Sequence, residues 1–447
     1  MIIYFTCYFY FISWYIIELK GILGGIMKKR KVLILFIIIL ILLAVGLFSI
    51  PKLENMVNKS QNNDEVETIG NIVEPIVQEK ENIKTIEIAA TGDILIHKEI
   101  LETQYDASSD TYDFKNTLQY VREYLSNADL TISNLEGTLS GFENYGFSGY
   151  PSFNAPDELA DAMKWAGIDV VNNMNNHSLD RDIRGFYRTR EILENRGFDI
   201  IGTRSSTDNN RYIIKDVKGI KLGIISYSYT MTAEEGYRGL NGTPISSEVY
   251  PLMNTFREDS LEEDFKGMRE EIDKMKSDGA EVIIFYMHWG DEYELEPNET
   301  QIKIANFLAN NGVDIVFATH PHSLQPIDVI KSEDGLHETS VIYSMGNFLS
   351  SQRTERIENP YTEDGVIVFV KINKNEDTGE LKIEYPTYIP TWVNWYGKED
   401  KLFYEVVPAT ISDASYLMGE GKTRVVESFN RSQRIIESYS DKIKVRD

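Results

Sequence analysis

Five of the six histidines in this chain lie in four short polar clusters, and each cluster directly follows an apolar run typical of a β-strand. A fifth cluster has the same layout but carries a glutamate instead of a histidine. The five clusters are 91–97, 134–137, 175–177, 286–290 and 319–322. Imidazole, carboxylate and amide groups are ligands that divalent metal ions take in proteins. The sequence therefore predicts a metal-binding site.

The candidate ligands are expected one to four residues past the ends of their strands. They are Asp93, Glu136, Asn176, His288 and His320. Because ligands bind outside the carboxyl ends of the strands in open α/β sheets, side chains from separate clusters should converge there. The two carboxylates would supply anionic oxygens, and either could bridge two ions. The amide of Asn176 would offer a neutral oxygen.

The His320-Pro321-His322 segment is expected to supply two ligands. In an extended segment, alternate side chains point the same way, and Pro321 fixes one backbone angle. Both imidazoles should then face one site. His177 is adjacent to Asn176 and is expected to stay free of metal, as a general acid or electrophile at the rim.

Each cluster also has an ordinary structural interpretation. Gly92-Asp93 could be a turn, and the Asn175–Ser178 segment could be a turn or a helix N-cap. His288-Trp289 could be a packed core pair, and His320-Pro321-His322 a surface loop. The five clusters taken together favour the metal site over five separate coincidences.

Composition limits the classes of partner and metal. The 447 residues carry a net charge of −25, which argues against nucleic acid and against an anionic membrane surface as partners. The single cysteine, Cys7, lies ahead of the portion expected to be exported, so that portion has no thiol ligands. Oxygen and imidazole ligands favour Mn, Fe or Zn, as one or two ions.

The first 84 residues are expected to anchor and tether the rest. Four basic residues at 28–31 precede an apolar run at 32–50, about long enough to cross a bilayer. We interpret 27–50 as a single membrane anchor with everything beyond it outside the cell membrane, and a cleaved signal peptide is the alternative. Residues 1–26 form an extension that could reflect a mis-assigned start, with translation beginning at Met27. Residues 51–84 are polar and are interpreted as a flexible linker.

Beyond the linker, strand and helix patterns alternate. Helices are expected at 114–126, 156–166, 181–196, 259–277 and 299–311. Strands are expected at 85–90, 130–133, 169–172, 199–201, 212–216, 221–226, 282–286, 314–318, 324–330, 340–343 and 365–372. This alternation predicts an α/β sandwich with a mixed sheet, over a domain spanning 85–372. Residues 373–447 are expected to hold further strands and a polar tail that could end in a helix.

Several motifs resemble those of a known family in order, spacing and identity. They are Thr91-Gly92-Asp93, Asn134-Leu135-Glu136, Asn175–Asp180, His288–Tyr293, His320-Pro321-His322 and Tyr343–Phe348. The family is that of the capsule-synthesis protein CapA, also called the PgsA type of poly-γ-glutamate biosynthesis. The resemblance runs from about Ile88 to Leu349. It implies a four-layer α-β-β-α sandwich of the metallophosphatase-like (calcineurin-like) kind.

The resemblance also implies a two-metal site of the phosphoesterase kind. Asp93 and His322 would hold the first ion, and Glu136 would bridge it to the second. The remaining ligands of the second ion would be Asn176, His288 and His320. Two neighbouring ions can activate a water and stabilise an in-line displacement.

Other roles are implied for residues around these ligands. His177 would protonate a leaving group. Metallophosphatases have an Asp-x-His motif where this chain has Leu95, and His97 could compensate if the strand stays extended. They also have an aspartate where Glu136 stands. Asp180 and Glu292 are further candidate site residues.

The implied function is that of a membrane-anchored extracytoplasmic protein for capsule or poly-γ-glutamate synthesis or export, with a hydrolase-like site. Two alternatives stay open: a metal-dependent phosphoesterase acting on a cell-envelope substrate, and a non-catalytic scaffold of a polymer export complex. The expected partners are the membrane, a polymer synthase or exporter complex, and an anionic polymer or envelope substrate. Because the chain is acidic, contact with a polyanion should be local.

Overall fold

The structure is a computed structural model that describes residues 82–447, except 233–237, 399–400, 411–416, 418 and 447. The predicted extension at 1–26, the predicted anchor at 27–50 and most of the predicted linker lie outside the described residues. Within the described part of the chain, no helix is both long and apolar enough to cross a membrane. The first strand begins at Ile83, two residues before the predicted start of the domain.

The first sheet has ten strands and follows the order β21-β20-β18-β1-β4-β5-β6 along its main path. These strands are β1 (Ile83–Ile94), β4 (Leu130–Leu135), β5 (Val170–Asn172), β6 (Asp199–Ile201), β18 (Asp364–Asn375), β20 (Thr387–Lys398) and β21 (Lys401–Pro408). The strands β1, β4, β5 and β6 are mutually parallel, whereas β18, β20 and β21 pair antiparallel. Three short strands complete it: β17 (Asn347–Leu349), β19 (Leu381–Ile383) and β22 (Lys444–Val445).

The second sheet has seven strands, with β7 beside β8 and a main path β12-β8-β13-β14-β16-β15. These strands are β7 (Ile213–Val217), β8 (Ile220–Tyr229), β12 (Thr255–Phe256), β13 (Val282–His288), β14 (Ile315–Thr319), β15 (Ile327–Lys331) and β16 (Glu338–Ile342). Its central strands β8, β13, β14 and β16 run parallel. Both sheets are therefore mixed, as predicted from the alternating strand and helix patterns.

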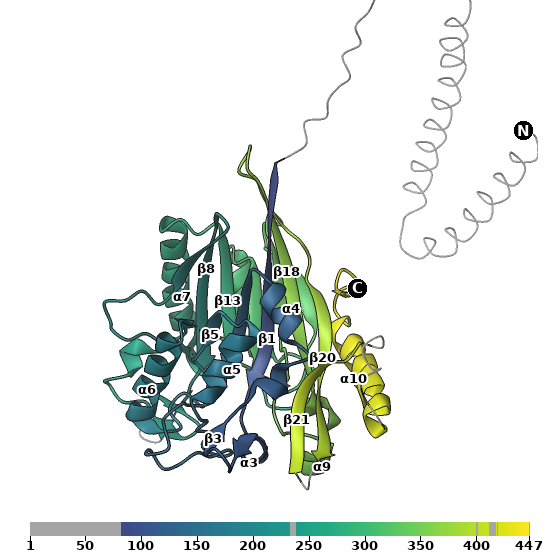
Figure 1. The fold of residues 1–447 in the computed structure, drawn as a ribbon. Coiled ribbons are helices and arrows are strands. Elements are labelled where there is room, and N and C mark those ends of the chain that lie inside the picture. The colour runs from purple at the N-terminus through teal and green to yellow at the C-terminus, as the bar shows by residue number, and fades with distance from the viewer. Residues whose placement is uncertain (1–81, 233–237, 399–400, 411–416, 418, 447) are drawn as a thin grey trace, which may run out of the picture. The chain divides into compact units, whose positions relative to one another are not determined.

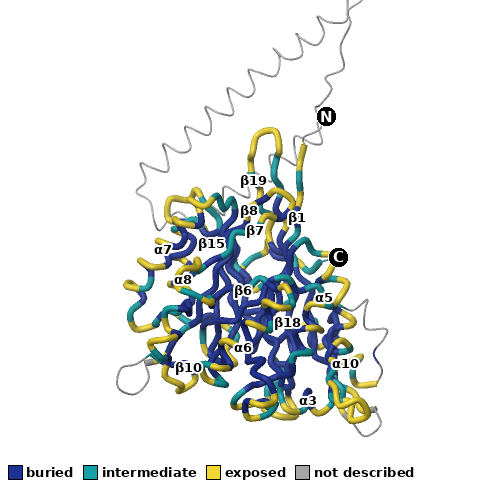
Figure 2. The backbone as a smooth tube through the Cα atoms, turned by 60° about the vertical axis from the view of Figure 1, so that its left-hand side comes forward, coloured by how far each residue is buried: buried dark blue, intermediate teal, exposed yellow. Residues whose placement is uncertain are grey.

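The two sheets pack face to face with helices on their outer sides (Figures 1 and 2). Apolar side chains of both sheets, such as Ile88, Ile132, Ile224 and Ile284, fill one core between them. The outer face of the first sheet packs against α3 (Lys98–Gln104), α4 (Arg122–Asn127), α5 (Glu158–Ala166) and α6 (Asp182–Asn195). The outer face of the second packs against α7 (Leu261–Ser277) and α8 (Glu299–Asn310). This arrangement confirms the predicted α/β class and the four layers.

One predicted helix is divided. The segment 114–126 forms a short 3-10 helix, η1 (Lys115–Leu118), and then α4, instead of one continuous helix. Leu118, Val121 and Leu125 are spaced three and four residues apart, and all three are fully buried against the first sheet.

The last part of the chain belongs to the first sheet. β20 pairs with β18, and β21, a strand that was not predicted, pairs with β20. The helix α10 (Glu420–Ile436) occupies part of the expected polar tail and packs Ile435 and Ile436 into the core beside β18. The described residues all fall in one compact unit, which includes this segment.

Candidate metal centre

The candidate ligands come from both sheets, at the carboxyl ends of parallel strands. Glu136 and His320 each follow the last residue of a strand, β4 and β14, and Asn176 lies four residues past β5. Asp93 and His288, however, lie within β1 and β13 instead of beyond them. β1 continues through Asp93 because it pairs there with both β4 and β17, and β13 reaches His288 because it pairs with β8 and β14 up to that residue.

Two groups of three side chains could each hold a metal ion, and they share Glu136. The first group is Asp93, Glu136 and His322, and the second is Glu136, His288 and His320. Within each group the candidate ligand atoms lie within 4.8 Å of one another, and all five side chains are buried. The Oε1 atom of Glu136 is 3.7 Å from Nε2 of His322 and 3.8 Å from Nε2 of His288. A single carboxylate therefore faces both groups.

Four atoms of these groups lack ordinary hydrogen-bond partners. Both carboxylate oxygens of Glu136, the Oδ2 atom of Asp93 and the Nδ1 atom of His320 are buried without a hydrogen bond among the described residues. Buried polar atoms in folded proteins are nearly always hydrogen-bonded, because an unpaired one keeps its desolvation cost. Divalent ions bound by oxygen and imidazole would satisfy these atoms, so the residues present fit the predicted metal site.

The backbone at His320 and His322 is not extended, so the geometry predicted for this segment is wrong. Their φ angles are 104° and 55°, both in the left-handed region. β14 ends at Thr319 and the chain turns there, so the two imidazoles reach the site through the turn and not through strand alternation. Their ring centroids are 6.1 Å apart. Non-glycine residues at such angles are uncommon and cluster at functional sites.

The second group has an amide oxygen beside it. The Oδ1 atom of Asn176 lies 2.8 Å from Nε2 of His288. The other nitrogen of His288, Nδ1, lies 3.0 Å from the hydroxyl of Thr319, which holds the ring in place. Neutral histidines that bind metal through one nitrogen are commonly oriented by a hydrogen bond at the other. Asn176, predicted as a ligand, therefore lies where its oxygen could join His288 on one ion.

His177 lies next to the site and is held by Asp180. Its Nδ1 atom is 2.8 Å from Oδ2 of Asp180, and both side chains are only 7% exposed. The same carboxylate oxygen accepts a hydrogen bond from the backbone N–H of Phe153. Among the described residues, neither His177 nor Asp180 belongs to a metal-binding group. Asp180 therefore lies beside His177, the predicted acid, and not among the candidate metal ligands.

Burial and neighbouring charges shift the pKa of each candidate ligand in the metal-free site. Burial lowers the pKa of His320 to about 3 and, with the neighbouring imidazoles, holds the pKa of His288 well below its usual value. Burial alone would lower the pKa of His322, but the neighbouring carboxylate of Asp93 has the larger effect, so the pKa of His322 is raised. Burial would raise the pKa of Asp93, but His322 and other hydrogen-bond donors lower it. Burial and the nearby charge of Asp93 raise the pKa of Glu136 well above its usual value.

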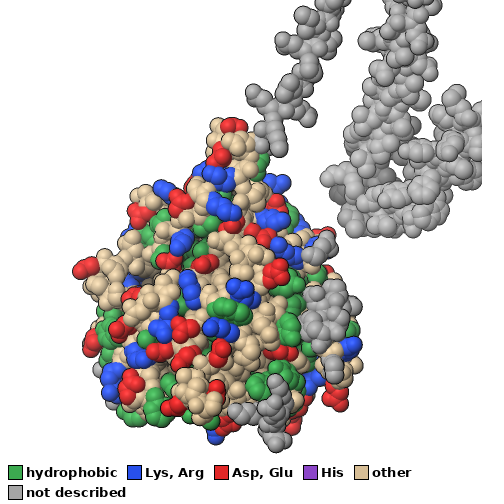
Figure 3. Space-filling view, in the orientation of Figure 1, with side chains coloured by type: hydrophobic (Ala, Val, Ile, Leu, Met, Phe, Trp, Pro, Cys, Tyr) green, Lys and Arg blue, Asp and Glu red, His purple; other side chains and the backbone are tan. Residues whose placement is uncertain are grey.

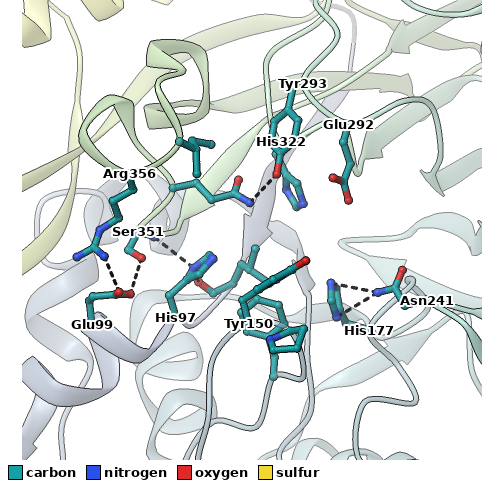
Figure 4. A pocket seen from close by; sticks show the side chains of 15 residues that line it. His97, Glu99, Tyr150, His177, Asn241, Glu292, Tyr293, His322, Ser351 and Arg356 are labelled. Atoms are coloured by element: carbon teal, nitrogen blue, oxygen red, sulfur yellow. Dashed lines mark hydrogen bonds and ion pairs between the residues drawn. The ribbon is translucent and has the colours of Figure 1, made fainter.

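A cavity of about 610 Å³ opens beside these groups (Figure 4). His177 and His322 line one end, and the ion pair of Glu99 with Arg356 lines the other. The aromatic rings of Tyr150 and Tyr293, among others, form its walls, and the predicted site residue Glu292 also lines it. A cavity of this volume is large enough to hold a small molecule or the end of a polymer chain.

His97 lines the cavity but does not reach either metal-binding group. The condition for its predicted role, an extended strand, is not met, because β1 ends at Ile94 and His97 is the N-cap residue of α3. Its Nδ1 atom accepts a hydrogen bond from the backbone N–H of Ser351 and lies 3.3 Å from the carbonyl of Leu95. Burial is the main cause that lowers its pKa to about 4, so the ring is neutral at physiological pH.

Sequence reasoning missed three residues that support the site. Asn134 donates from Nδ2 to Oδ1 of Asp93 at 2.7 Å, and Asn347 places its Oδ1 atom 3.1 Å from Nδ1 of His322. Asn134 could have been found, because it lies two residues before Glu136 on the same face of an extended strand. Asn241 contacts both Asn176 and His177, and only its Asn-Gly turn signal was visible in the sequence.

The chain is similar to two curated proteins from Bacillus. It is 25% identical to the PGA biosynthesis protein CapA of Bacillus subtilis (strain 168) over 65% of this chain and 69% of that protein. It is also 25% identical to the capsule biosynthesis protein CapA of Bacillus anthracis, over 67% of this chain and 66% of that protein. The match therefore spans about two thirds of the length of each relative.

Solved structures of two other proteins are also similar. A phosphatase from Mycoplasma pneumoniae has a TM-score of 0.39 at 15% identity, covering 69% of this chain and 94% of that one. A putative 5'-nucleotidase from Staphylococcus aureus has a TM-score of 0.42 at 14% identity, covering 78% and 58%. The model of the family described as bacterial capsule synthesis protein PGA_cap matches residues 87–352, which is more than half of the chain. The protein belongs to this capsule synthesis family.

Proposed function

We propose that this protein acts in capsule or poly-γ-glutamate synthesis or export as a metal-dependent hydrolase of the phosphoesterase kind. The observation that carries the proposal is the sharing of Glu136 by two buried ligand groups, at the end of a cavity lined by His177. Membership of the capsule synthesis family supports the process. The unpaired buried ligand atoms support the chemistry.

Each candidate ligand has one place in the proposed site. Asp93 and His322 would hold one ion, Glu136 would contact both, and the second would be held by Asn176, His288 and His320. Mn, Fe or Zn ions bound here would activate water and stabilise the charge of an in-line displacement. One hydrogen bond from Asn134 to Asp93 and the contact of Asn347 with His322 hold the first group in place. Such supporting contacts commonly tune affinity for the metal.

His177 is the proposed general acid. The carboxylate of Asp180 would accept a hydrogen bond from Nδ1–H of His177, so that Nε2 is the nitrogen that donates a proton to the oxygen of the leaving group. The ring of Phe153 packs edge-on against His177, with centroids 4.7 Å apart, and limits its rotation. The imidazole is therefore oriented before the substrate binds, which is what proton transfer to a leaving group needs.

The charge pattern supports local rather than extended contact with an anionic substrate. The cavity carries Glu99 and Glu292, and Arg356 is already paired with Glu99. Acidic and basic side chains alternate over the face of the molecule drawn in Figure 3. One anionic group of a polymer or envelope substrate would therefore bind at the metal centre, while the remainder of the substrate makes uncharged contacts.

The proposed location is the outer face of the cell membrane. The support comes from the sequence, where basic residues at 28–31 precede the apolar run at 32–50. A polymer synthase or exporter complex is the proposed partner, and the family membership supports it. A phosphoesterase that acts on another cell-envelope substrate would use the same site.

A non-catalytic scaffold of an export complex is the second candidate. The first ligand group favours this candidate. That group has three members among the described residues, since Leu95 offers no ligand and His97 does not reach the group. A scaffold could keep the fold, and even a structural ion, without turnover. This candidate predicts that ligand substitutions lower stability but leave polymer export intact.

Complementation of a deletion strain separates these candidates. The strain would receive the wild-type gene, His177→Ala or Glu136→Ala, and surface polymer and phosphoester turnover with Mn²⁺ would be measured. The hydrolase proposal expects both variants to be expressed but to fail in export and turnover. Full export with both variants would favour the scaffold. Unchanged polymer in the deletion strain itself would contradict a role in capsule synthesis or export.

A further inference from the structure

A small hairpin carries an asparagine to the edge of the metal centre. The strands β10 (Arg238–Leu240) and β11 (Thr243–Pro244) are joined by Asn241 and Gly242, whose φ angles are 47° and 78°. Asn-Gly is a favoured pair for a two-residue hairpin turn in which both residues have positive φ. The turn explains the backbone, but it does not explain where the side chain of Asn241 points.

That side chain contacts two residues of the proposed site, Asn176 and His177, and Figure 4 shows the contact with His177. The Oδ1 atom of Asn241 accepts a hydrogen bond from Nδ2 of Asn176 at 3.2 Å. The Nδ2 atom of Asn241 lies 3.3 Å from both ring nitrogens of His177. One carboxamide therefore links the candidate ligand and the proposed acid.

The hairpin and the loop that holds these residues are packed together. Leu240, directly before Asn241, is buried in one apolar cluster with Met174 and Leu179, which flank Asn176 and His177 in the sequence. Ile245, just past β11, belongs to the same cluster. The core contact of the hairpin with this loop thus brings Asn241, which is itself exposed, next to the residues that it touches.

The contact with Asn176 has a chemical consequence. A carboxamide has an oxygen that can bind a cation and an NH₂ group that cannot, and the two ends have nearly the same shape. Because Asn241 accepts from the NH₂ group of Asn176, the oxygen of Asn176 faces Nε2 of His288 at 2.8 Å. Without Asn241, the amide of Asn176 would be free to turn its NH₂ group toward a cation.

We propose that Asn241 is a positioning residue for the second ligand group, which orients the amide of Asn176 toward a metal ion shared with His288. The inference rests on the proposed metal site. It predicts that Asn241 affects only one of two bound ions, because its contacts do not include Asp93 or His322. Residues that orient a metal ligand typically change metal affinity by about 10- to 100-fold when they are replaced.

The test is a titration of the full-length, metal-free protein with Mn²⁺ or Zn²⁺ by calorimetry. Asn241→Gly removes the carboxamide and suits the positive φ, so the turn is retained. Thr243→Ala, an exposed change in the same hairpin, is the matched control. Asn241→Asp keeps an oxygen that can accept from Asn176 and serves as the rescue variant.

The inference expects two binding phases in the wild type and in Thr243→Ala. In Asn241→Gly one phase should weaken by about 10- to 100-fold while the other is unchanged, and Asn241→Asp should restore it. Two phases of unchanged affinity in Asn241→Gly would overturn the inference alone. Equal weakening of both phases would also overturn it, because a general loss of structure would act on both ions. A wild-type protein that binds no divalent ion would overturn the proposed function and this inference with it.

Discussion

The Oε1 atom of Glu136 lies 3.7 Å from Nε2 of His322, too far for a hydrogen bond but close enough for both atoms to contact one ion. The same oxygen lies 3.8 Å from Nε2 of His288, which belongs to the other group. A buried carboxylate with imidazoles on two sides and no hydrogen-bond partner among the described residues is costly unless a cation is present.

Glu136 should destabilise the metal-free protein. We expect Glu136→Gln to raise the free energy of unfolding of the chelator-treated protein by about 1 kcal/mol at neutral pH, because it removes an ionisable group whose pKa is raised by burial in the folded state. The change should also sharply weaken metal binding, since it removes the shared anionic ligand. Thermal unfolding with and without Mn²⁺ would measure both effects.

Glu363 is the matched control, because it is equally buried but paired. Its carboxylate accepts from Arg424 at 2.6 and 2.8 Å and from Nε1 of Trp392 at 2.8 Å. Glu363→Gln should lower the free energy of unfolding by about 3 kcal/mol, since it breaks a buried ion pair. If Glu136→Gln destabilised the metal-free protein as much as Glu363→Gln does, Glu136 would be a structural residue and not a metal ligand.

Metal affinity should increase with pH. The pKa values of Glu136 and His322 are raised in the metal-free protein, so each of these ligands keeps a proton to a higher pH than usual. Metal binding must displace such protons, and affinity therefore falls as the pH drops through these raised values. Titration calorimetry at about pH 6 and about pH 8, in buffers of different ionisation enthalpy, should show release of at least about one proton per chain. An affinity that is independent of pH would speak against these ligands.

His177 should be needed for turnover but not for metal binding. If the protein hydrolyses a phosphoester, His177→Ala should lower kcat by about 10²- to 10⁴-fold because the leaving group loses its proton donor. Asp180→Asn should also lower kcat, since Nδ1 of His177 loses its anionic partner. Metal content should be unchanged in both variants. His337→Ala is the control, because that ring contacts the carbonyl of Val313 instead of the site. Loss of metal in His177→Ala would make His177 a ligand.

Gly92 should tolerate no side chain. A Cβ atom there would lie 1.9 Å from the carbonyl oxygen of Gly346, which also accepts the hydrogen bond from the N–H of Asp93. Gly92→Ala should therefore push β1 away from this contact, lower the free energy of unfolding by about 3 kcal/mol and displace Asp93. Gly267→Ala is the control, since nothing lies within 4 Å of its Cβ in α7, and it should stabilise by about 0.5–1 kcal/mol. Denaturant unfolding would compare them, and a neutral Gly92→Ala would contradict the packing described here.

Much of the fold could be predicted from local patterns. The helix expected at 259–277 differs from α7 by two residues, and the strand expected at 199–201 coincides with β6. The helix has a strong periodic pattern, and the strand closely follows Gly197, which marks the end of the preceding helix. β21 was missed because its pairing with β20 depends on the folded sheet and not on the local sequence. The division of the predicted helix at 114–126 into η1 and α4 has no signal in the local pattern either.

The site was harder to predict than the fold. Clusters at the ends of strands placed Asp93 and Glu136 near each other, because their parallel strands β1 and β4 are neighbours in one sheet. His288 reaches the same site from the second sheet, through the face-to-face packing of the two sheets. The turn at His320 and the helix cap at His97 depend on where β14 and β1 end, which the sequence did not define. The contact of Asn241 with His177 joins residues 64 apart and has no local pattern.

The most direct test of the central claim is the metal content of the full-length protein, purified without chelator, beside Glu136→Ala and the double variant His288→Ala/His320→Ala. The account predicts up to two equivalents of Mn, Fe or Zn in the wild type. Metal should be lost from Glu136→Ala, and the equivalent bound by the second group should be lost from the double variant. A wild-type protein that is well folded, free of metal and not stabilised by any added divalent ion would contradict it.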